Sequence, residues 1–362
     1  MSQKVVLIPS DNTACGLYRI RWPAEAVKAA RPDWNIEIAN PENAGFQIME
    51  NGDLYATRGF DLRDADVVVF QRVGSKPLMQ LMTWCKKNGK RVVVEVDDDL
   101  AEIHPANRAK SAWGPEQLKW FRAAFKMADV VTATTQPLVD RYAPHIGVVI
   151  PNLVPRAVLD LPRAVRPTEG LLEGPVAGWS GFVGTHPADL AEAKPFVRRW
   201  ERYGYQLAGM ADPDGIAKVW WPGEGLEERR ERLYRIGAAA LGPEYYQHMG
   251  WFDVGLVPLE DSKFNKAKSW LKVLEWSAVG VPVVASATPD NVAGSMRSDF
   301  DSTGRGLIYP TPRNALTWQR AADMLAEPLV RQELSQHNKA VVRERWTIEG
   351  NVERWIDAWS VK

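Results

Sequence analysis

Cysteine is scarce in this sequence, and neither sign of charge is in excess. Cys15 and Cys85 are the two cysteines among 362 residues, and their separation fits neither a disulfide framework nor a zinc site. We therefore expect a reducing compartment and a cytoplasmic location. Lys and Arg together number 45, as do Asp and Glu. This balance argues against a protein that holds nucleic acid through a strongly basic surface, although it leaves room for a local basic patch.

Long apolar runs and low-complexity tracts are also missing. No apolar run approaches the length of a bilayer span, and the apolar segment at residues 5–8 is too short for a signal-peptide core. We therefore expect neither a membrane span nor a secretion signal. The composition, with 45% hydrophobic and 25% charged residues, is typical of a globular protein. A chain of 362 residues suits two domains better than one core.

Short valine-rich runs alternate with helical patterns in the first half of the chain. The runs lie at residues 5–8, 67–70, 92–96, 130–133 and 148–150, and helical stretches lie at residues 22–30, 77–88 and 115–128. Continuous apolar runs of this length are typical of parallel strands buried on both faces. The alternation predicts a doubly wound α/β domain.

A second α/β series follows a Pro-, Arg- and Leu-rich stretch near residues 151–173. Its predicted strands lie at residues 176–179, 205–209, 219–220, 254–258, 281–285 and 306–308, and residues 341–359 have apolar positions at helical spacing. We predict an α/β fold of two doubly wound, Rossmann-like domains at residues 1–168 and 169–340, with terminal helices at 341–362. Two such domains can turn the carboxyl ends of both sheets toward a shared cleft, where open α/β sheets bind ligands.

The most informative segment spans residues 253–286. It predicts a strand ending at Pro258, a polar loop, a helix over residues 268–279 and another strand. Backbone N–H groups at the start of such a helix attract phosphate. Lys268, Lys272 and Glu275 share one face of the predicted helix, and they offer cations to a diphosphate and a carboxylate to ribose hydroxyls. A solvated helix face with intrahelical ion pairs explains the same pattern equally well.

Residues 265–286, NKAKSWLKVLEWSAVGVPVVAS, resemble the donor-binding segment of GT-B glycosyltransferases of the glycogen-synthase-like retaining group (glycosyl transferases group 1). The resemblance implies that the first domain faces the acceptor, that the second binds a nucleotide sugar, and that the terminal helices cross back onto the first. It also implies that Glu275 binds the donor ribose and that Asn265, Lys268, Ser269 and Lys272 lie near the donor.

One position departs from the family pattern. Ala267 stands where the family commonly has a second glutamate, and this departure bears on the retaining stereochemistry that the resemblance implies. The resemblance implies no cofactor and no bound metal, with the nucleoside diphosphate sugar as co-substrate.

Two glycine-containing loops support the resemblance. Gly16, Tyr18 and Arg19 follow the first strand and resemble the loop by which the N-terminal domain approaches the sugar or acceptor. A glycine at such a place is also common in ordinary strand-to-helix turns. Another set follows the first strand of the second domain and resembles the loop that cradles the donor phosphates. Its candidate donor-binding residues are Ser180, Gly181 and His186, although His186 also suits a simple helix start.

The acidic run Asp97-Asp98-Asp99 follows a predicted strand. Carboxylates at this spacing are compatible with a metal site, but at a strand end they also bind hydroxyls or cap a helix. We favour contact with sugar or acceptor hydroxyls for Asp97 and Asp98, with Asp98 as a candidate catalytic residue. Arg72 and His104 are expected as neighbours on the acceptor side.

Together these features predict a glycosyltransferase that moves a hexosyl or pentosyl group to an acceptor hydroxyl, with Lys268 and Lys272 stabilising the leaving diphosphate. A non-catalytic nucleotide-sugar-binding module and a GT-B-like epimerase are the alternatives. The acceptor stays open between a small metabolite, a lipid, a protein and a modified DNA base. Nucleic acid is considered because arginines cluster at residues 198, 199 and 202 and at 229, 230, 232 and 235, although solvated helix faces balanced by glutamates explain the clusters more simply.

Overall fold

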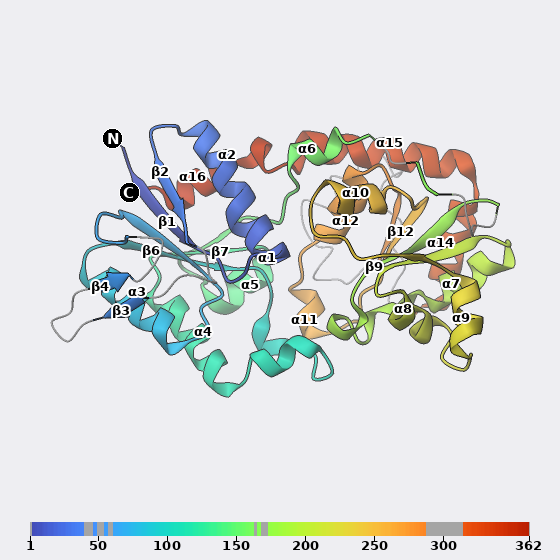
Figure 1. Cartoon of the computed structure of the whole chain (residues 1–362), viewed down its shortest axis with the longest axis horizontal. Helices are drawn as coiled ribbons and strands as arrows, with labels where there is room; N and C mark the ends of the chain where they lie inside the picture. Colours follow the sequence, from blue (N-terminus) through green and yellow to red (C-terminus); the bar gives the residue numbers. More distant parts are fainter. Residues whose placement is uncertain are drawn as a thin grey trace.

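The computed structural model describes residues 2–39, 61–162, 165–167, 173–286 and 314–361, with the backbone of the short antiparallel pair β3 (Phe46–Ile48) and β4 (Leu54–Ala56). The chain forms two halves that lie side by side along the long axis (Figure 1). Each half is built around a parallel sheet. This arrangement confirms the predicted α/β class with two doubly wound domains.

The first sheet has six strands in the order β2-β1-β5-β6-β7-β8. Its members are β1 (Lys4–Ile8), β2 (Asn35–Ile38), β5 (Val67–Gln71), β6 (Arg91–Val96), β7 (Val130–Ala133) and β8 (Gly147–Val149). All of these pairings are parallel. The valine runs lie at the centre of the sheet, where both faces are covered, so every residue of β5 is buried. Only β2 was not predicted, because it is short and polar.

Helices cover both faces of this sheet. They are α2 (Trp22–Ala30), α3 (Lys76–Lys87), α4 (Pro115–Met127) and α5 (Gln136–Tyr142). Proline stands in the first turn of each, where its missing N–H costs no helical hydrogen bond. At the start of α3, the Ser75 hydroxyl also accepts a hydrogen bond from the Leu78 N–H at 3.4 Å.

The second sheet has, within the described residues, the strand order β11-β10-β9-β12-β13. These strands are β9 (Val176–Gly181), β10 (Gln206–Ala211), β11 (Leu233–Ile236), β12 (Val254–Val257) and β13 (Val283–Ala285). All of them run parallel. The helices packed around them are α7 (Lys194–Arg202), α8 (Pro213–Trp220), α9 (Leu226–Arg232), α10 (Pro243–Met249), α12 (Leu271–Ala278) and α14 (Ala315–Ala326).

The prediction of a strand at residues 219–220 is wrong, because these residues end helix α8. The Asp212 side chain caps the helix by accepting from the Gly215 N–H at 3.1 Å. Ile216, Ala217 and Trp220 are buried at helical spacing, so the apolar pair at the end of the helix belongs to a helical stripe. The strand predicted at residues 306–308 lies outside the described residues.

The helix predicted over residues 268–279 is present as α12 (Leu271–Ala278), but its predicted start is wrong. A short helix, α11 (Lys263–Lys266), comes first, with Ser262 as its cap, and α12 begins only at Leu271. The three residues 268–270 lie outside both helices. Lys268 therefore does not share a helix face with Lys272 and Glu275, although it stays near them in space.

The end of the chain returns to the first half. Helix α15 (Pro328–Arg345) runs along the second half, and α16 (Glu353–Trp359) packs on α2 (Figure 1). Gln3 Nε2 donates to the Trp359 carbonyl at 2.7 Å, and the Trp359 side chain is buried. The predicted domain boundary at residues 168–169 lies outside the described residues. No helix in the described part of the chain is both long and apolar enough to cross a membrane.

Candidate functional site

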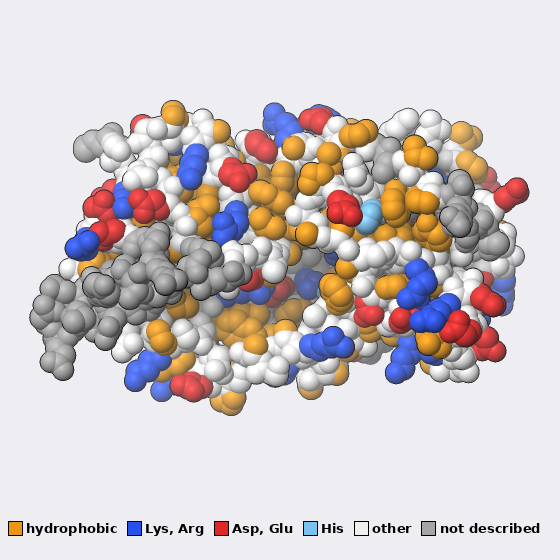
Figure 2. Space-filling view, in the orientation of Figure 1, with side chains coloured by type: hydrophobic (Ala, Val, Ile, Leu, Met, Phe, Trp, Pro, Cys, Tyr) orange, Lys and Arg blue, Asp and Glu red, His pale blue; other side chains and the backbone are white. Residues whose placement is uncertain are grey.

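The carboxyl ends of the two sheets face each other across the middle of the molecule. The face shown in Figure 2 is hollowed there, and basic and acidic side chains lie at the bottom of the hollow. The loops after β1, β5 and β6 of the first domain and the loops after β9 and β12 of the second domain lie at these carboxyl ends. The candidate residues of both domains come from these loops and from the helices that follow them.

Gly16 lies in a tight turn after β1. The Asp11 carboxylate accepts hydrogen bonds from the N–H groups of Thr13 and Gly16 at 2.8 and 3.1 Å. A Cβ atom at Gly16 would lie 2.0 Å from the Asp11 carbonyl oxygen, so a larger residue does not fit this turn. The turn leads through α1 (Ala14–Gly16) into the π-helical segment η1 (Leu17–Arg21), which carries Tyr18 and Arg19.

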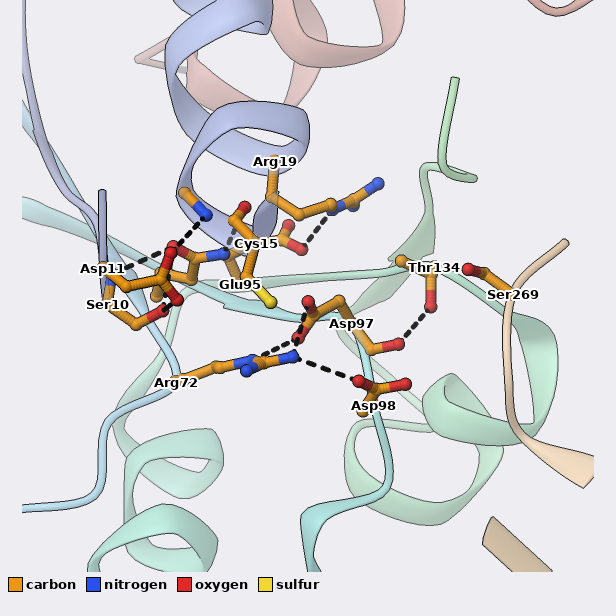
Figure 3. A network of polar contacts seen from close by, with 12 residues as sticks. Ser10, Asp11, Cys15, Arg19, Arg72, Glu95, Asp97, Asp98, Thr134 and Ser269 are labelled. Atoms are coloured by element: carbon orange, nitrogen blue, oxygen red, sulfur yellow. Dashed lines mark hydrogen bonds and ion pairs between the residues drawn. The ribbon is translucent and has the colours of Figure 1, made fainter. Parts of the chain in front are cut away.

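Arg19 lies inside the first domain and not on the acceptor-facing surface. Its side chain is 1% exposed and its Nε donates to Glu95 Oε1 at 2.6 Å (Figure 3). Burial raises the pKa of Glu95, although the charge of Arg19 opposes this. Arg19 Nη1 also bonds to the Pro151 carbonyl and to Asn152 Oδ1. The residue thus ties the Gly16 turn to β6 and to the connection between the domains.

Arg72, Asp97 and Asp98 form a cluster at the ends of β5 and β6 (Figure 3). Arg72 binds both oxygens of Asp97, at 2.5 and 2.7 Å, and Asp98 Oδ2 at 3.1 Å. Burial alone would raise the pKa of Asp97, but Arg72 outweighs it and holds the pKa below its usual value. Asp98 is the more accessible carboxylate, since its side chain is 26% exposed against 7% for Asp97. Asp98 is therefore the better placed to meet a ligand.

The third aspartate points to other partners. Asp99 accepts from Arg141 at 2.6 Å and from the Tyr142 hydroxyl at 2.5 Å, so it joins the loop after β6 to α5. His104 Nδ1 accepts from the Ala106 N–H at 3.1 Å and closes its own turn. Among the residues that the structure describes, no group of three or more His, Cys, Asp or Glu side chains is arranged to hold a metal ion.

Tyr18 joins the two domains through a buried polar cluster. Its hydroxyl donates to Glu275 Oε1 at 2.6 Å and also contacts the Tyr246 hydroxyl. Glu275 Oε2 accepts from the Tyr245 hydroxyl at 3.1 Å and pairs with Lys272 Nζ at 2.9 Å. Both oxygens of Glu275 therefore have donors within the protein, and its side chain is only 3% exposed.

The neighbours of Lys272 and Tyr245 shift the pKa values of these two side chains. Burial opposes the charge of Lys272, but Glu275 and Tyr245 together raise its pKa above the usual value. Burial raises the pKa of Tyr245 to about 12, so Tyr245 stays a neutral donor. Tyr245 and Tyr246 were not predicted from the sequence, because they lie on α10, which precedes residues 253–286. Two adjacent tyrosines in a helix form no spacing that indicates a site.

Removing the Tyr18 hydroxyl tests this interdomain contact. We expect Tyr18→Phe to lower the free energy of unfolding by about 1.5–3 kcal/mol, because a buried hydrogen bond to a charged group is lost. Tyr203→Phe is the matched control, since Tyr203 donates to Asp323 at 2.8 Å on the surface. Urea denaturation would compare the two variants. Equal losses in both would mean that the buried contact contributes nothing special.

Lys268, Ser269 and Ala267 lie against the first domain. Lys268 Nζ is 3.9 Å from Asp98 Oδ1, and the Asn152 amide donates to Ser269 Oγ at 2.7 Å. The carbonyl of Ala267 accepts from the Thr135 hydroxyl at 2.8 Å, and the buried Ala267 side chain belongs to the core of the first domain. The position that carries a glutamate in the family pattern is therefore an interdomain packing position here.

His186 and Asn265 are held by one buried carboxylate, that of Asp189. His186 Nδ1 lies 2.8 Å from Asp189 Oδ2, and Asp189 Oδ1 accepts from the Asn265 amide at 2.7 Å and from the Glu260 N–H at 2.9 Å. Burial lowers the pKa of His186, and the charges of Lys268 and Lys272 act in the same direction. Asn265 is 3% exposed, which makes it a support for the loop.

Ser180 and Gly181 end strand β9. Ser180 is buried, and its hydroxyl lies beside the Tyr245 phenol. Gly181 has a φ of 151°, and a Cβ atom there would meet the Trp179 ring at 2.7 Å, so the position favours glycine.

A small cavity with about 210 Å³ of empty space, counting its open mouth, lies between the ends of β12 and β13 and the start of α12. It is lined by Val257, Leu259, Ser269, Trp270, Val273, Ala285 and Ser286.

Comparison with known proteins establishes the fold. No protein-family model and no curated protein matches the chain. Among solved structures, sucrose-phosphate synthase from Thermosynechococcus elongatus is similar with a TM-score of 0.64 and 15% identity, over 99% of this chain and 100% of that chain. A glycosyltransferase from Rickettsia africae has a TM-score of 0.60 and 12% identity, over 99% of this chain and 98% of that chain.

An epimerase shares the same arrangement. The putative UDP-N-acetylglucosamine 2-epimerase from Listeria monocytogenes is similar with a TM-score of 0.53 and 14% identity, over 99% of this chain and 96% of that chain. The matches span both domains in their relative placement, and the chain has the GT-B fold.

Proposed function

We propose that this chain is a glycosyltransferase that moves a sugar from a nucleoside diphosphate sugar to an acceptor hydroxyl. The observation that carries the proposal is the gathering of Lys268, Ser269 and Lys272 before and within the first turn of α12, at the carboxyl edge of the second sheet. Cations and free N–H groups at a helix start suit a diphosphate. The GT-B fold of glycosyltransferases provides the frame.

In this proposal Lys268 and Lys272 neutralise the charge that develops on the departing diphosphate. Asp98 faces them from the first domain and accepts hydrogen bonds from sugar or acceptor hydroxyls. Glu275 supports the site mainly by holding Lys272 and Tyr18, because its own oxygens already have donors. A contact between Glu275 and the donor ribose would require one of these donors to move.

We further propose transfer with retention and without a bound metal ion, as in the group that the donor segment resembles. Ala267 contributes no carboxylate to the sugar site, so Asp98 is the candidate to supply one. The stereochemistry is open to a direct test, since NMR of the first-formed product distinguishes the two anomers. Formation of the anomer opposite to that of the donor would contradict retention.

The arginine clusters favour an acceptor other than nucleic acid. Several of these arginines have carboxylate partners, such as Arg199 with Asp323 at 2.5 Å and Arg235 with Asp214 at 2.6 Å. Arg232 likewise bonds to Glu201 at 2.5 Å. Basic and acidic side chains are mixed over the region of α9 (Figure 2). Binding to DNA that weakens steeply with added salt would reverse this preference.

Incubation with a panel of nucleotide sugars and candidate acceptors tests the function. Release of free nucleoside diphosphate that depends on the acceptor indicates transfer. A changed sugar on an intact nucleotide indicates the epimerase, which the Listeria structure makes the second candidate. Binding in a thermal-shift screen without turnover indicates a non-catalytic module. The same screen would identify the preferred base and sugar.

A further inference from the structure

The His186–Asp189 pair lies beside the segment that leads to Lys268, because Asp189 bonds to Glu260 and Asn265 of that segment. Asp189 is buried, and three groups bond to its carboxylate: His186 Nδ1, the Asn265 amide and the Glu260 N–H. The imidazole is therefore held at Nδ1, and the edge of the Trp179 ring fixes its plane at a centroid distance of 5.6 Å. Its side chain keeps 22% exposure, unlike Asp189 at 7%.

The atom left to meet a ligand is Nε2. When Nδ1–H donates to Asp189, a neutral imidazole presents a lone pair at Nε2, and a protonated one presents an N–H. A diphosphate oxygen can accept from that N–H but cannot donate to the lone pair. His186 would thus form a hydrogen bond to the diphosphate only when its imidazole is protonated.

The charges around His186 set when it takes up a proton. Lys268 and Lys272 oppose the imidazolium, as burial does, and Asp189 favours it. The side chain of Arg108 packs against Gly184 in the turn η4 (Val183–Thr185) just before His186. In the free protein, burial and the two lysines therefore favour the neutral form of His186. An arriving diphosphate brings negative charge to the same place and reverses the balance.

We propose that His186, oriented by Asp189, takes up a proton when a nucleoside diphosphate binds and donates a hydrogen bond from Nε2 to the diphosphate. The inference rests on the proposed function, because it assumes that the diphosphate lies beside Lys268 and Lys272. The proton comes from solvent, adds to Nε2 and is returned when the diphosphate leaves. Diphosphate affinity therefore falls as pH rises through the pKa of His186 in the complex.

Two substitutions separate the hydrogen bond from the proton. His186→Gln places a neutral N–H donor near the Nε2 position, so it should keep binding while losing proton uptake. His186→Asn keeps a contact to Asp189 but leaves nothing at Nε2, and should weaken binding roughly tenfold. Asp189→Asn removes the charge that favours the imidazolium and should reduce proton uptake. His145→Gln is the control, since His145 is exposed and precedes β8, an edge strand of the first sheet.

The experiment is calorimetry with UDP, ADP and GDP in buffers of different ionisation enthalpy, from pH 6.5 to 8.5. We expect the wild type to take up on the order of half a proton more than His186→Gln, which corresponds to about a threefold difference in affinity per pH unit. The terminal phosphate of the nucleotide titrates near a pKa of about 6 in both proteins, so the difference isolates His186.

The outcomes separate the two proposals. Binding with equal proton uptake in the wild type and His186→Gln overturns the inference on His186 and leaves the diphosphate site standing. If none of the three nucleotides binds the wild type, the proposed function fails and the inference fails with it. Reduced uptake in His186→Gln and Asp189→Asn, with normal uptake in His145→Gln, supports both.

Discussion

Lys272→Ala is expected to lower kcat for sugar transfer by about 10²–10³-fold, the usual effect of removing one group that stabilises developing negative charge. The Lys272 side chain is 34% exposed, and its Nζ lies 2.9 Å from Glu275 Oε2, at the edge of the buried cluster. Its raised pKa keeps it charged throughout the range in which enzymes are assayed. The charge is therefore available to the departing diphosphate. Initial rates with saturating donor would measure the loss.

Two further variants distinguish a catalytic effect from a folding defect. Lys266→Ala is the matched control, because Lys266 precedes the site on α11 and lies 3.5 Å from Asp261. Lys272→Ala also leaves Glu275 short of a cation, so Lys272→Ala with Glu275→Gln removes the stranded charge. If the double variant regains both stability and activity, Lys272 acts only through Glu275. A rate for Lys272→Ala equal to that of Lys266→Ala would exclude Lys272 from the reaction.

The parallel sheets could be predicted because strands buried on both faces consist of continuous apolar runs. The runs that became β5, β6 and β7 are continuous and valine-rich, and they needed no tertiary information. The short apolar pair at the end of α8 was ambiguous by itself. The helical assignment of this pair depends on the cap at Asp212 and on the buried positions upstream. These features indicate a helix only when the whole segment is considered together.

The gathering of the candidate residues could be predicted from the sequence, but their contacts could not. The sequence located Lys268, Lys272 and Glu275 near one another, and all three lie at the carboxyl edge of the second sheet. It did not show that α12 begins at Leu271 or that Lys268 is drawn toward Asp98 across the cleft. Such contacts join residues far apart in the chain. They depend on how the domains pack, which cannot be inferred from the spacing of residues in one segment.

Arg19 is a residue whose burial could not be predicted from its neighbours in the sequence. Its position after Gly16 suggested a surface that meets the acceptor, yet its side chain is 1% exposed and paired with Glu95, itself 2% exposed. Nothing in residues 16–19 distinguishes a buried arginine from an exposed one, because its partner lies on β6. A polar residue in a loop is ordinarily expected at the surface.

Arg19→Met should therefore have the largest effect on stability, about 3–5 kcal/mol in the free energy of unfolding, because it leaves a buried carboxylate without its cation. Arg63→Met is the control. Arg63 binds Asp61 at 2.6 Å but is 74% exposed, and such surface pairs contribute about 0–1 kcal/mol. Urea denaturation followed by circular dichroism would compare the two variants with the wild type.

The pH dependence of Arg19→Met identifies the cause of its instability. Without Arg19, burial raises the pKa of Glu95 further above its ordinary value of 4.5. A carboxyl with a raised pKa in the folded state contributes stability at low pH and loses it as the pH rises through the folded pKa. The deficit of Arg19→Met should therefore grow from pH 4 to pH 7. Adding Glu95→Gln should restore much of the stability and flatten this dependence, whereas a deficit that persists unchanged in the double variant would trace it to lost packing of the arginine side chain.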